Sequence, residues 1–567
     1  MNPEQQDEHN QELLRASANG DLNAIKSALK RGADINTRIK RGTIELNPLY
    51  LALKNKQFEV ASYLIKNGAD MYAYGGENMI MNQFIIDKQA DVIKFLIEKM
   101  HYDLNIGDKL SRVPLHIAVR ENQLELIRYF LRKKANINAQ DSEGNTAVSK
   151  ATHIENEMAT KLLLELGANP NIANIHGNTP IFSAVFKNNK KLLLLLHQYH
   201  ADMNFLNNQG RNCLWDALKC KHFNLFYGLL CLGADATQQD NQGNTILHQC
   251  IYKTDYNTCK FILDCFITFN RSLKIGEKSI DIDQPDSYGH SALQKAIKLK
   301  DFKKADLLLK YGADIEWRTP NYHLTALLNA AYTGNLEGVK YCIQKNANIS
   351  HKDIEECSAL MLSVKKGHND IVQYLIKQGI DINSTDDKGQ TALFYSALRN
   401  NLEATQILLQ AGANPHITDS WGRNIYWPII RVNNADLLKQ CIDLGLDKNI
   451  QDNHGETILH YAVRKENLSI IPVLLANKVN SETTNNSGET ALELAEKIKD
   501  QLKTKKSNIT IEEYNHRVEA LAKIIKHLKV AKYKHQQNKV EQPIITPIVH
   551  HPQNSSQTHK SKVHINE

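Results

Sequence analysis

The sequence predicts an all-α fold: a solenoid of about 15 helix-turn-helix units with β-hairpin fingers, followed by a C-terminal helix and a disordered tail. Three observations predict it. The chain has 567 residues, which is too long for one hydrophobic core to serve the whole molecule. Apolar and charged residues make up 42% and 23% of it, ordinary values for a folded protein, and they exclude wholesale disorder. Finally, two short phrases recur at a nearly constant spacing along most of the chain.

The first phrase is Gly-Ala followed by Asp or Asn, as at Gly32, Gly167 and Gly312. The second begins at a Thr-like position, most often Thr, Ser or Asn, and precedes the first by a constant distance. Its starting positions are Gln11, Asn47, Met79, Val113, Thr146, Thr179, Asn212, Thr245, Ser291, Thr325, Ser358, Thr391, Asn424, Thr457 and Thr490. Most successive positions lie 33 residues apart, but the step from Thr245 to Ser291 spans 46.

The chemistry of these residues predicts two helices and a turn in each unit. Thr, Ser or Asn at the starting position caps the first helix, and a following proline such as Pro180 fits the first helical position. An aliphatic triplet such as 307–309 marks the second helix, which Gly312 ends. A polar segment then closes on Asp-x-x-Gly, as in Asp240 to Gly243, and this pattern predicts a turned finger.

This 33-residue unit resembles the ankyrin repeat, over roughly residues 10–500. Within it, Val113 to His116 keeps the Pro-Leu-His of the family phrase, and the unit around Met79 is the most degenerate. The resemblance implies a stack of L-shaped units with a row of fingers along one edge. It also implies that finger tips and the ends of the first helices contact partner proteins.

The predicted organisation follows from these boundaries. Residues 1–9 are expected to be disordered, and residues 10–500 form the array, with an insertion at about 269–281. The insertion either contacts a ligand or is merely tolerated in a surface loop. Residues 501–530 form an amphipathic helix that covers the open end of the stack, with partner or membrane binding as the alternative. Residues 531–567 form a disordered basic tail.

Charge and cysteine usage indicate where the protein works. The net charge is +7, and residues 497–567 contain 14 Lys or Arg against 6 Asp or Glu, so the preceding chain is nearly neutral. The nine cysteines have no zinc-binding spacing and are interpreted as reduced thiols. Neither a secretory signal nor a membrane-spanning segment is visible. We therefore expect a cytoplasmic protein, or one delivered by a non-Sec route into a host cytosol.

No catalytic residue, cofactor or metal site is predicted, because the common enzyme motifs are absent. His116, His248 and His460 occupy the position where the family itself carries a structural histidine. Cys250 stands where other units have alanine and is interpreted as a packing residue. The tail histidines are His550, His551, His559 and His564. They lie among prolines and serines, so a solvated tail is favoured over a metal site.

A basic stripe is the main candidate for a binding site. At the two places ending each first helix, 13 of 30 residues are Lys or Arg, against 69 of 567 in the whole chain. The predicted protein-binding residues, including aromatic neighbours, are Lys187, Lys219, Tyr252, Lys253, Tyr288, Lys298, Tyr322, Tyr332, Lys365, Lys366, Arg399, Trp421, Arg431, Arg464 and Lys465. Their chemistry implies an acidic partner. The competing explanation is that helix C-termini favour cations through the helix dipole.

The predicted function is a protein–protein interaction scaffold, a monomer that binds partners through its concave finger and inner-helix face. The chain also resembles ankyrin-rich effectors that intracellular bacteria deliver into host cells. Two alternatives remain open: a catalytic segment hidden at Met71 to Met100 or Lys503 to Val530, and a membrane-surface adaptor that uses the basic C-terminus. Nucleic acid is not an expected partner, because residues 1–496 are nearly neutral.

Overall fold

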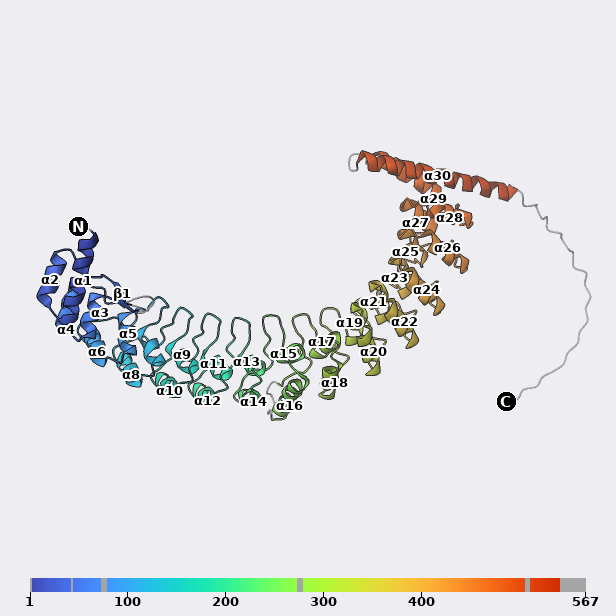
Figure 1. Ribbon diagram of the computed structural model, residues 1–567. Coiled ribbons are helices and arrows are strands. Elements are labelled where there is room, and N and C mark those ends of the chain that lie inside the picture. Colours follow the sequence, from blue (N-terminus) through green and yellow to red (C-terminus); the bar gives the residue numbers. More distant parts are fainter. Residues whose placement is uncertain (1–2, 42–43, 73–78, 273–278, 505–509, 541–567) are drawn as a thin grey trace, which may run out of the picture. The chain divides into compact units, whose positions relative to one another are not determined.

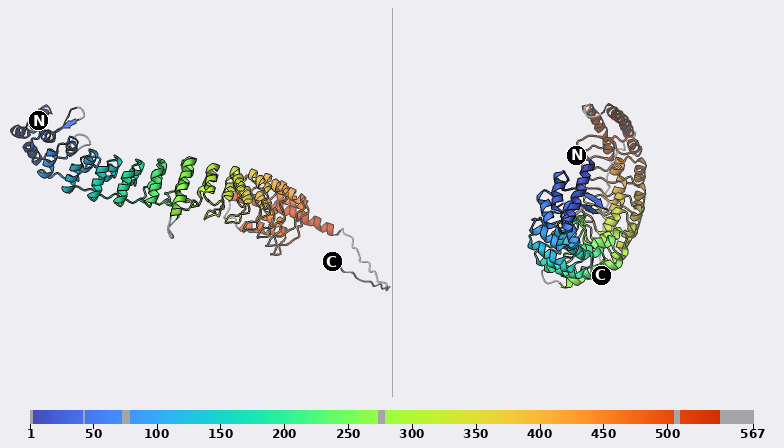
Figure 2. Two further views of the ribbon diagram at one scale, coloured as in Figure 1. Left: turned by 90° about the horizontal axis from the view of Figure 1, so that it is seen from below. Right: turned by 60° about the vertical axis from the view of Figure 1, so that its left-hand side comes forward.

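A computed structural model describes residues 3–41, 44–72, 79–272, 279–504 and 510–540. In these residues the chain forms thirty helices that pair in chain order, which confirms the all-α solenoid (Figure 1). The chain divides into two compact units, Met1–Asn321 and Tyr322–Glu567. Figure 2 shows the helices of the first unit standing side by side.

The helices of the first unit are α1 (Pro3–Asn19), α2 (Leu22–Lys30), α3 (Pro48–Lys54), α4 (Phe58–Lys66), α5 (Ile80–Ile86), α6 (Ala90–Glu98), α7 (Pro114–Arg120), α8 (Leu124–Arg132), α9 (Ala147–His153), α10 (Glu157–Glu165), α11 (Pro180–Phe186), α12 (Lys190–Gln198), α13 (Cys213–Lys219), α14 (Phe223–Cys231), α15 (Ile246–Lys253), α16 (Tyr256–Ser272), α17 (Ala292–Lys298) and α18 (Phe302–Lys310). Two short strands, β1 (Ile39–Arg41) and β2 (Ile44–Leu46), pair antiparallel in the first finger.

The helices of the second unit are α19 (Ala326–Thr333), α20 (Leu336–Gln344), α21 (Ala359–Lys366), α22 (Asn369–Lys377), α23 (Ala392–Leu398), α24 (Leu402–Gln410), α25 (Tyr426–Arg431), α26 (Ala435–Asp443), α27 (Ile458–Arg464), α28 (Ile470–Ala476), α29 (Ala491–Thr504) and α30 (Ile511–Val540). We call the odd-numbered helices inner helices and the even-numbered ones outer helices. Within each unit, most inner helices pack on the next inner helix, and most outer helices pack on the next outer helix.

The core lies between the two rows of helices. In α7 the side chains of Leu115, Ala118 and Val119 are buried, and in α8 those of Ile127 and Phe130. Most repeats have a small residue at the position equivalent to Ala118, which lets neighbouring helices approach closely. Cys250 stands at this position in α15 and is fully buried, and its burial raises the pKa of its thiol. The packing role predicted for Cys250 agrees with this placement.

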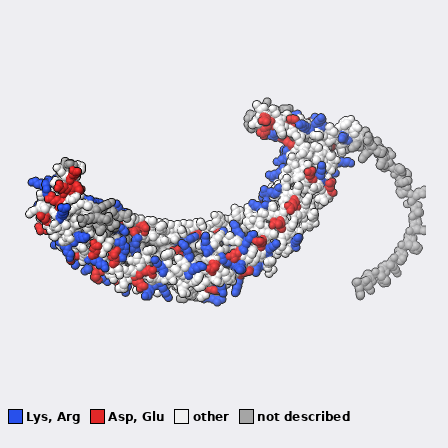
Figure 3. All heavy atoms as spheres, in the orientation of Figure 1, with Lys and Arg blue, Asp and Glu red and all other residues white. Residues whose placement is uncertain are grey.

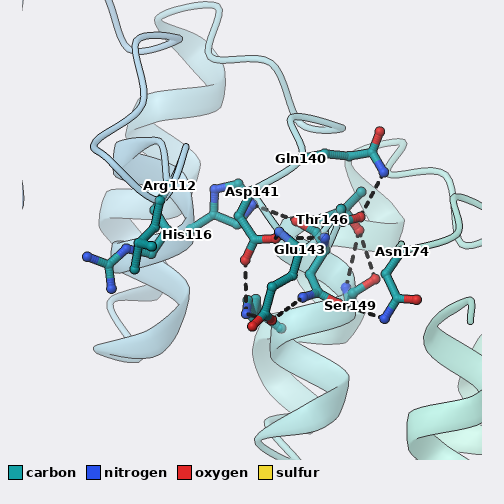
Figure 4. Close-up of polar contacts among 12 residues, drawn as sticks. Arg112, His116, Gln140, Asp141, Glu143, Thr146, Ser149 and Asn174 are labelled. Atoms are coloured by element: carbon teal, nitrogen blue, oxygen red, sulfur yellow. Dashed lines mark hydrogen bonds and ion pairs between the residues drawn. The ribbon is translucent and has the colours of Figure 1, made fainter. Parts of the chain in front are cut away.

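The fingers are tighter than the predicted β-hairpins. Among the described residues, paired strands occur only in the first finger, and four later fingers contain an isolated bridge such as Gln140 to Thr146. In these later fingers, hydrogen bonds to a side chain hold the turn instead of a strand pair. Asp141 accepts hydrogen bonds from the backbone N–H groups of Glu143 (3.0 Å) and Asn145 (2.8 Å), and its other oxygen lies 2.9 Å from Lys150 Nζ (Figure 4). The short Asp-x-x-Gly segment therefore folds as an Asx turn.

Three buried histidines connect their repeats to the following finger. The Nδ1 atom of His116 accepts from Val113 N (3.2 Å), so Nε2 carries the proton and donates to the carbonyl of Asn145 (3.0 Å; Figure 4). His248 and His460 form the same pair of bonds. These contacts confirm their structural role.

An asparagine ladder, which the sequence analysis missed, links successive fingers. A side-chain oxygen on one finger accepts the backbone N–H located 31 residues later, at 2.7–2.9 Å. The residues supplying it are Asn105, Asn138, Asn171, Asn204, Asn383 and Asn449. The sequence signal for this ladder is an Asn two residues after the Asp or Asn of the Gly-Ala phrase. Asp283 holds this place in one finger and accepts from Asp314 N at 2.8 Å.

The ends of the array differ from the predicted boundaries. The sequence predicts disorder for residues 1–9, whereas α1 begins at Pro3, because Gln6 Nε2 donates to the carbonyl of Gly32 (2.7 Å) and ties the helix down. The predicted capping helix 501–530 corresponds to α30, the outer helix of the last pair, but α30 begins at Ile511 because residues 501–504 end α29. It continues to Val540, and no proline occurs before Pro543. The tail from 541 lies outside the described residues.

The predicted insertion at 269–281 is partly absorbed by a helix. The outer helix α16 continues to Ser272, so the first residues of the insertion extend this helix rather than follow it. Asn270 then bonds to Ile280 through both its side-chain amide (2.9 Å) and its side-chain oxygen (2.8 Å). Residues 273–278 lie outside the described residues.

We predict that Asp283→Asn stabilises the protein above pH 6. Burial raises the pKa of Asp283 to about 6, although the hydrogen bond from Asp314 N opposes this effect. The folded state therefore holds this proton more tightly than the unfolded chain, and stability is lost as pH rises from about 4 to 6. Asparagine keeps the acceptor without the charge, so the gain is about 1 kcal/mol at pH 8 after solvent screening.

Thermal unfolding at pH 8 and pH 4 measures this effect. The control is Asp202→Asn, because Asp202 is an exposed carboxylate at a finger start. An equal shift of the melting temperature for both variants, or a larger gain at pH 4, would contradict the prediction.

The buried histidines predict a second pH effect, of opposite sign. Burial lowers the pKa of His116, His248 and His460, whereas these groups titrate near 6.5 in an unfolded chain. The unfolded state then binds more protons, so stability falls as pH drops below about 6.5. In α17, Gln294 makes equivalent bonds, from Ser291 N (3.3 Å) and to the carbonyl of Trp317 (3.1 Å), without a titrating group.

His460→Gln should accordingly match the parent at pH 7.5 and exceed its melting temperature at pH 5.5. His460→Ala is the matched loss variant. It leaves Thr457 N and the carbonyl of Glu489 unpaired and should cost about 1–3 kcal/mol at both pH values. If His460→Gln follows the parent at pH 5.5, the histidine does not cause the acid sensitivity.

Candidate protein-interaction surface

Several inner helices of the first unit end on cations. Lys219, Lys253 and Lys298 are the last residues of α13, α15 and α17, and Lys187 caps α11. All four are exposed. The predicted aromatic neighbours Tyr252 and Tyr288 are exposed as well, by 43% and 71%.

Four cations form a row on the second unit, which we call the basic row. Lys366 ends α21, Arg399 caps α23, Arg431 ends α25 and Lys465 caps α27. All four are exposed, and in the described part of the chain none forms an ion pair. Their helices pack in sequence, so the charges follow one another at about 8–10 Å. Figure 3 shows Lys and Arg gathered along this edge of α23, α25 and α27.

Aromatic rings hold two of these cations in place. Lys366 Nζ lies 4.2 Å from the ring centroid of Tyr332, and Lys465 Nζ lies 5.6 Å from that of Tyr461. Such cation–π contacts restrict long side chains that would otherwise move freely. A small hollow of about 50 Å³ opens beside Arg431 and is lined by Phe394, Trp427 and Tyr461, among others. The basic row therefore has an aromatic floor.

Two other predicted residues are already engaged within the protein. Lys365 is half-buried, and its Nζ lies 3.0 Å from Cys357 Sγ and 3.2 Å from a carboxylate oxygen of Glu355. Arg464 pairs with Glu456. Sequence reasoning could not separate Lys365 from Lys366, because the difference depends on which way the last helical turn faces. We therefore leave Lys365 and Arg464 out of the basic row.

The remaining predicted aromatics lie on finger tips. Tyr322 is 63% exposed, whereas Trp421 is 39% exposed and stacks on the guanidinium of Arg423 at 4.5 Å. Arg423 also bonds to Asp419 at 2.8 Å. Trp421 is thus fixed on its finger as a flat apolar surface.

A hollow of about 610 Å³ lies between the fingers and the inner helices at the end of the second unit. Its lining combines the cations Arg464 and Lys497 with their carboxylate partners Glu456 and Glu489, so its charge is balanced. No cluster of three His, Cys, Asp or Glu side chains suited to a metal ion occurs in the residues that the structure describes. None of the described helices combines the length and apolar character needed to cross a bilayer.

Comparison with known proteins places this architecture. Two family models match the chain: Ankyrin repeats (3 copies) in overlapping segments that together span residues 13–419, and Ankyrin repeats (many copies) over residues 442–495. The ankyrin repeat domain of Bcl-3 is similar in structure, with a TM-score of 0.35 and 24% identity. That likeness covers 41% of this chain and 99% of the Bcl-3 domain.

Curated relatives match segments of the chain. Alpha-latrocrustotoxin-Lt1a of Latrodectus tredecimguttatus is 27% identical over 124 residues, 22% of this chain and 8% of the toxin. An ankyrin repeat protein of Acanthamoeba polyphaga mimivirus is 27% identical over 26% of this chain, and one of Rickettsia felis is 29% identical over 23%. Each of these two matches spans 42% of the relative's length. The family models extend much further, and they show that the chain belongs to the ankyrin-repeat family.

Proposed function

We propose that the protein is an interaction scaffold that binds an acidic segment of a partner protein along the basic row. Ankyrin repeats are generally protein-binding modules, and this supports a scaffold rather than an enzyme. The observation that carries the choice of surface is the row itself: four exposed cations without carboxylate partners among the described residues, spaced by one repeat. A partner presenting carboxylates at about 10 Å intervals would match it.

The helix dipole explains only part of this pattern. A cation at a helix C-terminus is stabilised by roughly 0.3–1 kcal/mol, and this applies to paired and unpaired cations alike. The array readily supplies carboxylates to such cations, as Glu456 does to Arg464 and Glu355 to Lys365. The dipole gives no reason for the basic row to lack them. The inner helices α19, α21, α23, α25 and α27 also contain no acidic residue.

Charge and aromatic area would have different roles in binding. Exposed ion pairs contribute little affinity but steer encounter, so the association rate should fall as salt rises. Tyr461, which is half-buried beside Arg431 in the small hollow, would provide an apolar contact of the kind found at interface hot spots. A sequence-independent grip on nucleic acid uses similar residues. The protein-binding proposal is favoured because residues 1–496 are nearly neutral.

The hypothesis of a translocated bacterial effector has a separate basis. It depends on a composition rich in Asn, Lys and Ile and on the tail 541–567, which lies outside the described residues. It stays a prediction, as do the cytoplasmic location and the monomeric state.

Charge reversal across the basic row tests the proposed function. The variant Lys366→Glu, Arg399→Glu, Arg431→Glu and Lys465→Glu is compared with the parent by affinity capture from cytosolic extract, at low and high salt. We expect specific loss of the captured partner and, with that partner purified, about 10- to 100-fold weaker binding by calorimetry.

The matched control reverses four exposed outer-helix lysines, Lys303, Lys310, Lys377 and Lys439, and it changes the net charge equally. Circular dichroism verifies that both variants are folded. If the basic-row variant retains the partner, or if the control loses it equally, the proposed function is contradicted. The helix dipole would then explain these cations. Captured material that disappears on nuclease treatment would favour nucleic acid instead.

A further inference from the structure

A second cationic surface lies in the second unit, between α28 and α30. The two helices and the segment that follows α28 enclose a hollow of about 850 Å³. Its lining includes four lysines and two histidines but no carboxylate. The lysines are Lys478, Lys523, Lys526 and Lys534. We call this hollow the α28–α30 groove.

Most of these lysines have no ion-pair partner among the residues that the structure describes. Lys523 pairs with Glu519 at 2.7 Å, one turn earlier in α30. Lys478, Lys526 and Lys534 are exposed, and in the described residues no carboxylate lies within ion-pair distance of them. By contrast, Lys529 points to the other side of α30 and pairs with Glu496 of α29 at 2.9 Å. Within the described residues the groove therefore keeps unpaired positive charge, whereas Lys529 on the α29 side is neutralised.

The groove also has an apolar floor. Leu475 and Val479 line it from the α28 side, and Val530 lines it from α30 with 49% of its surface exposed. The combination of apolar floor and cationic rim matches an amphipathic ligand with acidic flanks.

The length of the groove favours a linear occupant. Lys523 and Lys534 are separated by 11 positions of one helix, or about 17 Å at 1.5 Å per residue. A free phosphate or a single headgroup would contact only part of this distance. A bilayer is a flat surface and would meet protruding residues before it filled a hollow between two helices. An acidic helix can place apolar residues on the floor and carboxylates along the rim.

The chain's own tail is a poor match for the groove. Residues 541–567 contain two carboxylates, Glu541 and Glu567, located at opposite ends of the segment. Three prolines, Pro543, Pro547 and Pro552, interrupt any helical pattern. The occupant that fits the charge and shape is therefore a separate chain.

We propose that the α28–α30 groove docks an acidic, amphipathic helical segment of a partner protein. This site uses outer helices, whereas the basic row lies at the ends of inner helices, so the two surfaces can bind independently. The proposal does not rest on the function proposed for the basic row.

A defined peptide tests the proposal with the full-length chain. The probe is a fluorescein-labelled 18-residue peptide with Leu at every third or fourth position and Glu elsewhere, measured by fluorescence anisotropy. A scrambled peptide of the same composition has the same charge but no apolar face. We expect the amphipathic peptide to bind at least tenfold more tightly than the scrambled one, and Lys526→Glu with Lys534→Glu to weaken binding at least tenfold.

Two control variants make the result specific. Lys377→Glu with Lys439→Glu makes the same change in net charge on α22 and α26, and it should leave the affinity within twofold. The basic-row variant should also leave it unchanged, which separates failure of this proposal from failure of the proposed function. Equal binding of the scrambled peptide, or no binding of either peptide, would overturn the proposal.

Two further probes test the other occupants. A synthetic peptide of residues 541–567 should not bind, and binding that the double variant abolishes would identify the tail as the occupant instead. Vesicles of phosphatidylcholine with phosphatidylserine should not bind either. Vesicle binding that requires Lys526 and Lys534, without binding of the amphipathic peptide, would replace the proposed partner with a membrane surface.

Discussion

The nearest-neighbour contact between successive fingers is the constraint on which the rest of this structure depends. An Asx turn shapes fingers such as the one at Asp141, and a buried His or Gln connects four of the repeats to the backbone ahead. The asparagine ladder adds bonds that each span 31 residues and link one finger to the next. Helices of seven to nine residues are too short to be stable alone, so each repeat is ordered by the repeats on either side of it. A change that destabilises one finger therefore also destabilises the two neighbouring repeats.

Because the repeats stack, residues at one equivalent position of successive repeats form a row on the surface. The residue that ends an inner helix recurs at about the same place on the next helix, one packing distance away. Four successive cations give the basic row because the backbone beneath them is fixed. Cation–π contacts then hold Lys366 and Lys465. A surface ordered before binding loses less conformational entropy when a partner arrives.

The fold was predictable from the sequence because the 33-residue period, the helix caps and the Asp-x-x-Gly turns all point to one architecture. Side-chain pairing was less predictable. Lys365 and Lys366 are adjacent in sequence, yet one is half-buried against Cys357 and the other stacks on Tyr332. The α28–α30 groove was not predicted at all. Three of its lysines lie on α30 and Lys478 lies in the segment after α28, and only the packing of the last pair brings them together.

The last repeat pair shows why the end of a solenoid can acquire a distinct role. In the middle of the array, an outer helix has a neighbouring outer helix on each side, so packing restricts its composition. The long helix α30 has a described neighbour, α28, on one side of the outer row and packs on α29 beneath it. Its buried residues Leu521, Ile524 and Leu528 serve that packing. Lysines at the remaining positions keep the exposed surface soluble, as a terminal unit requires, and where they border the hollow beside α28 the same residues form a cationic rim. A solubility requirement and a binding site can thus share one set of side chains.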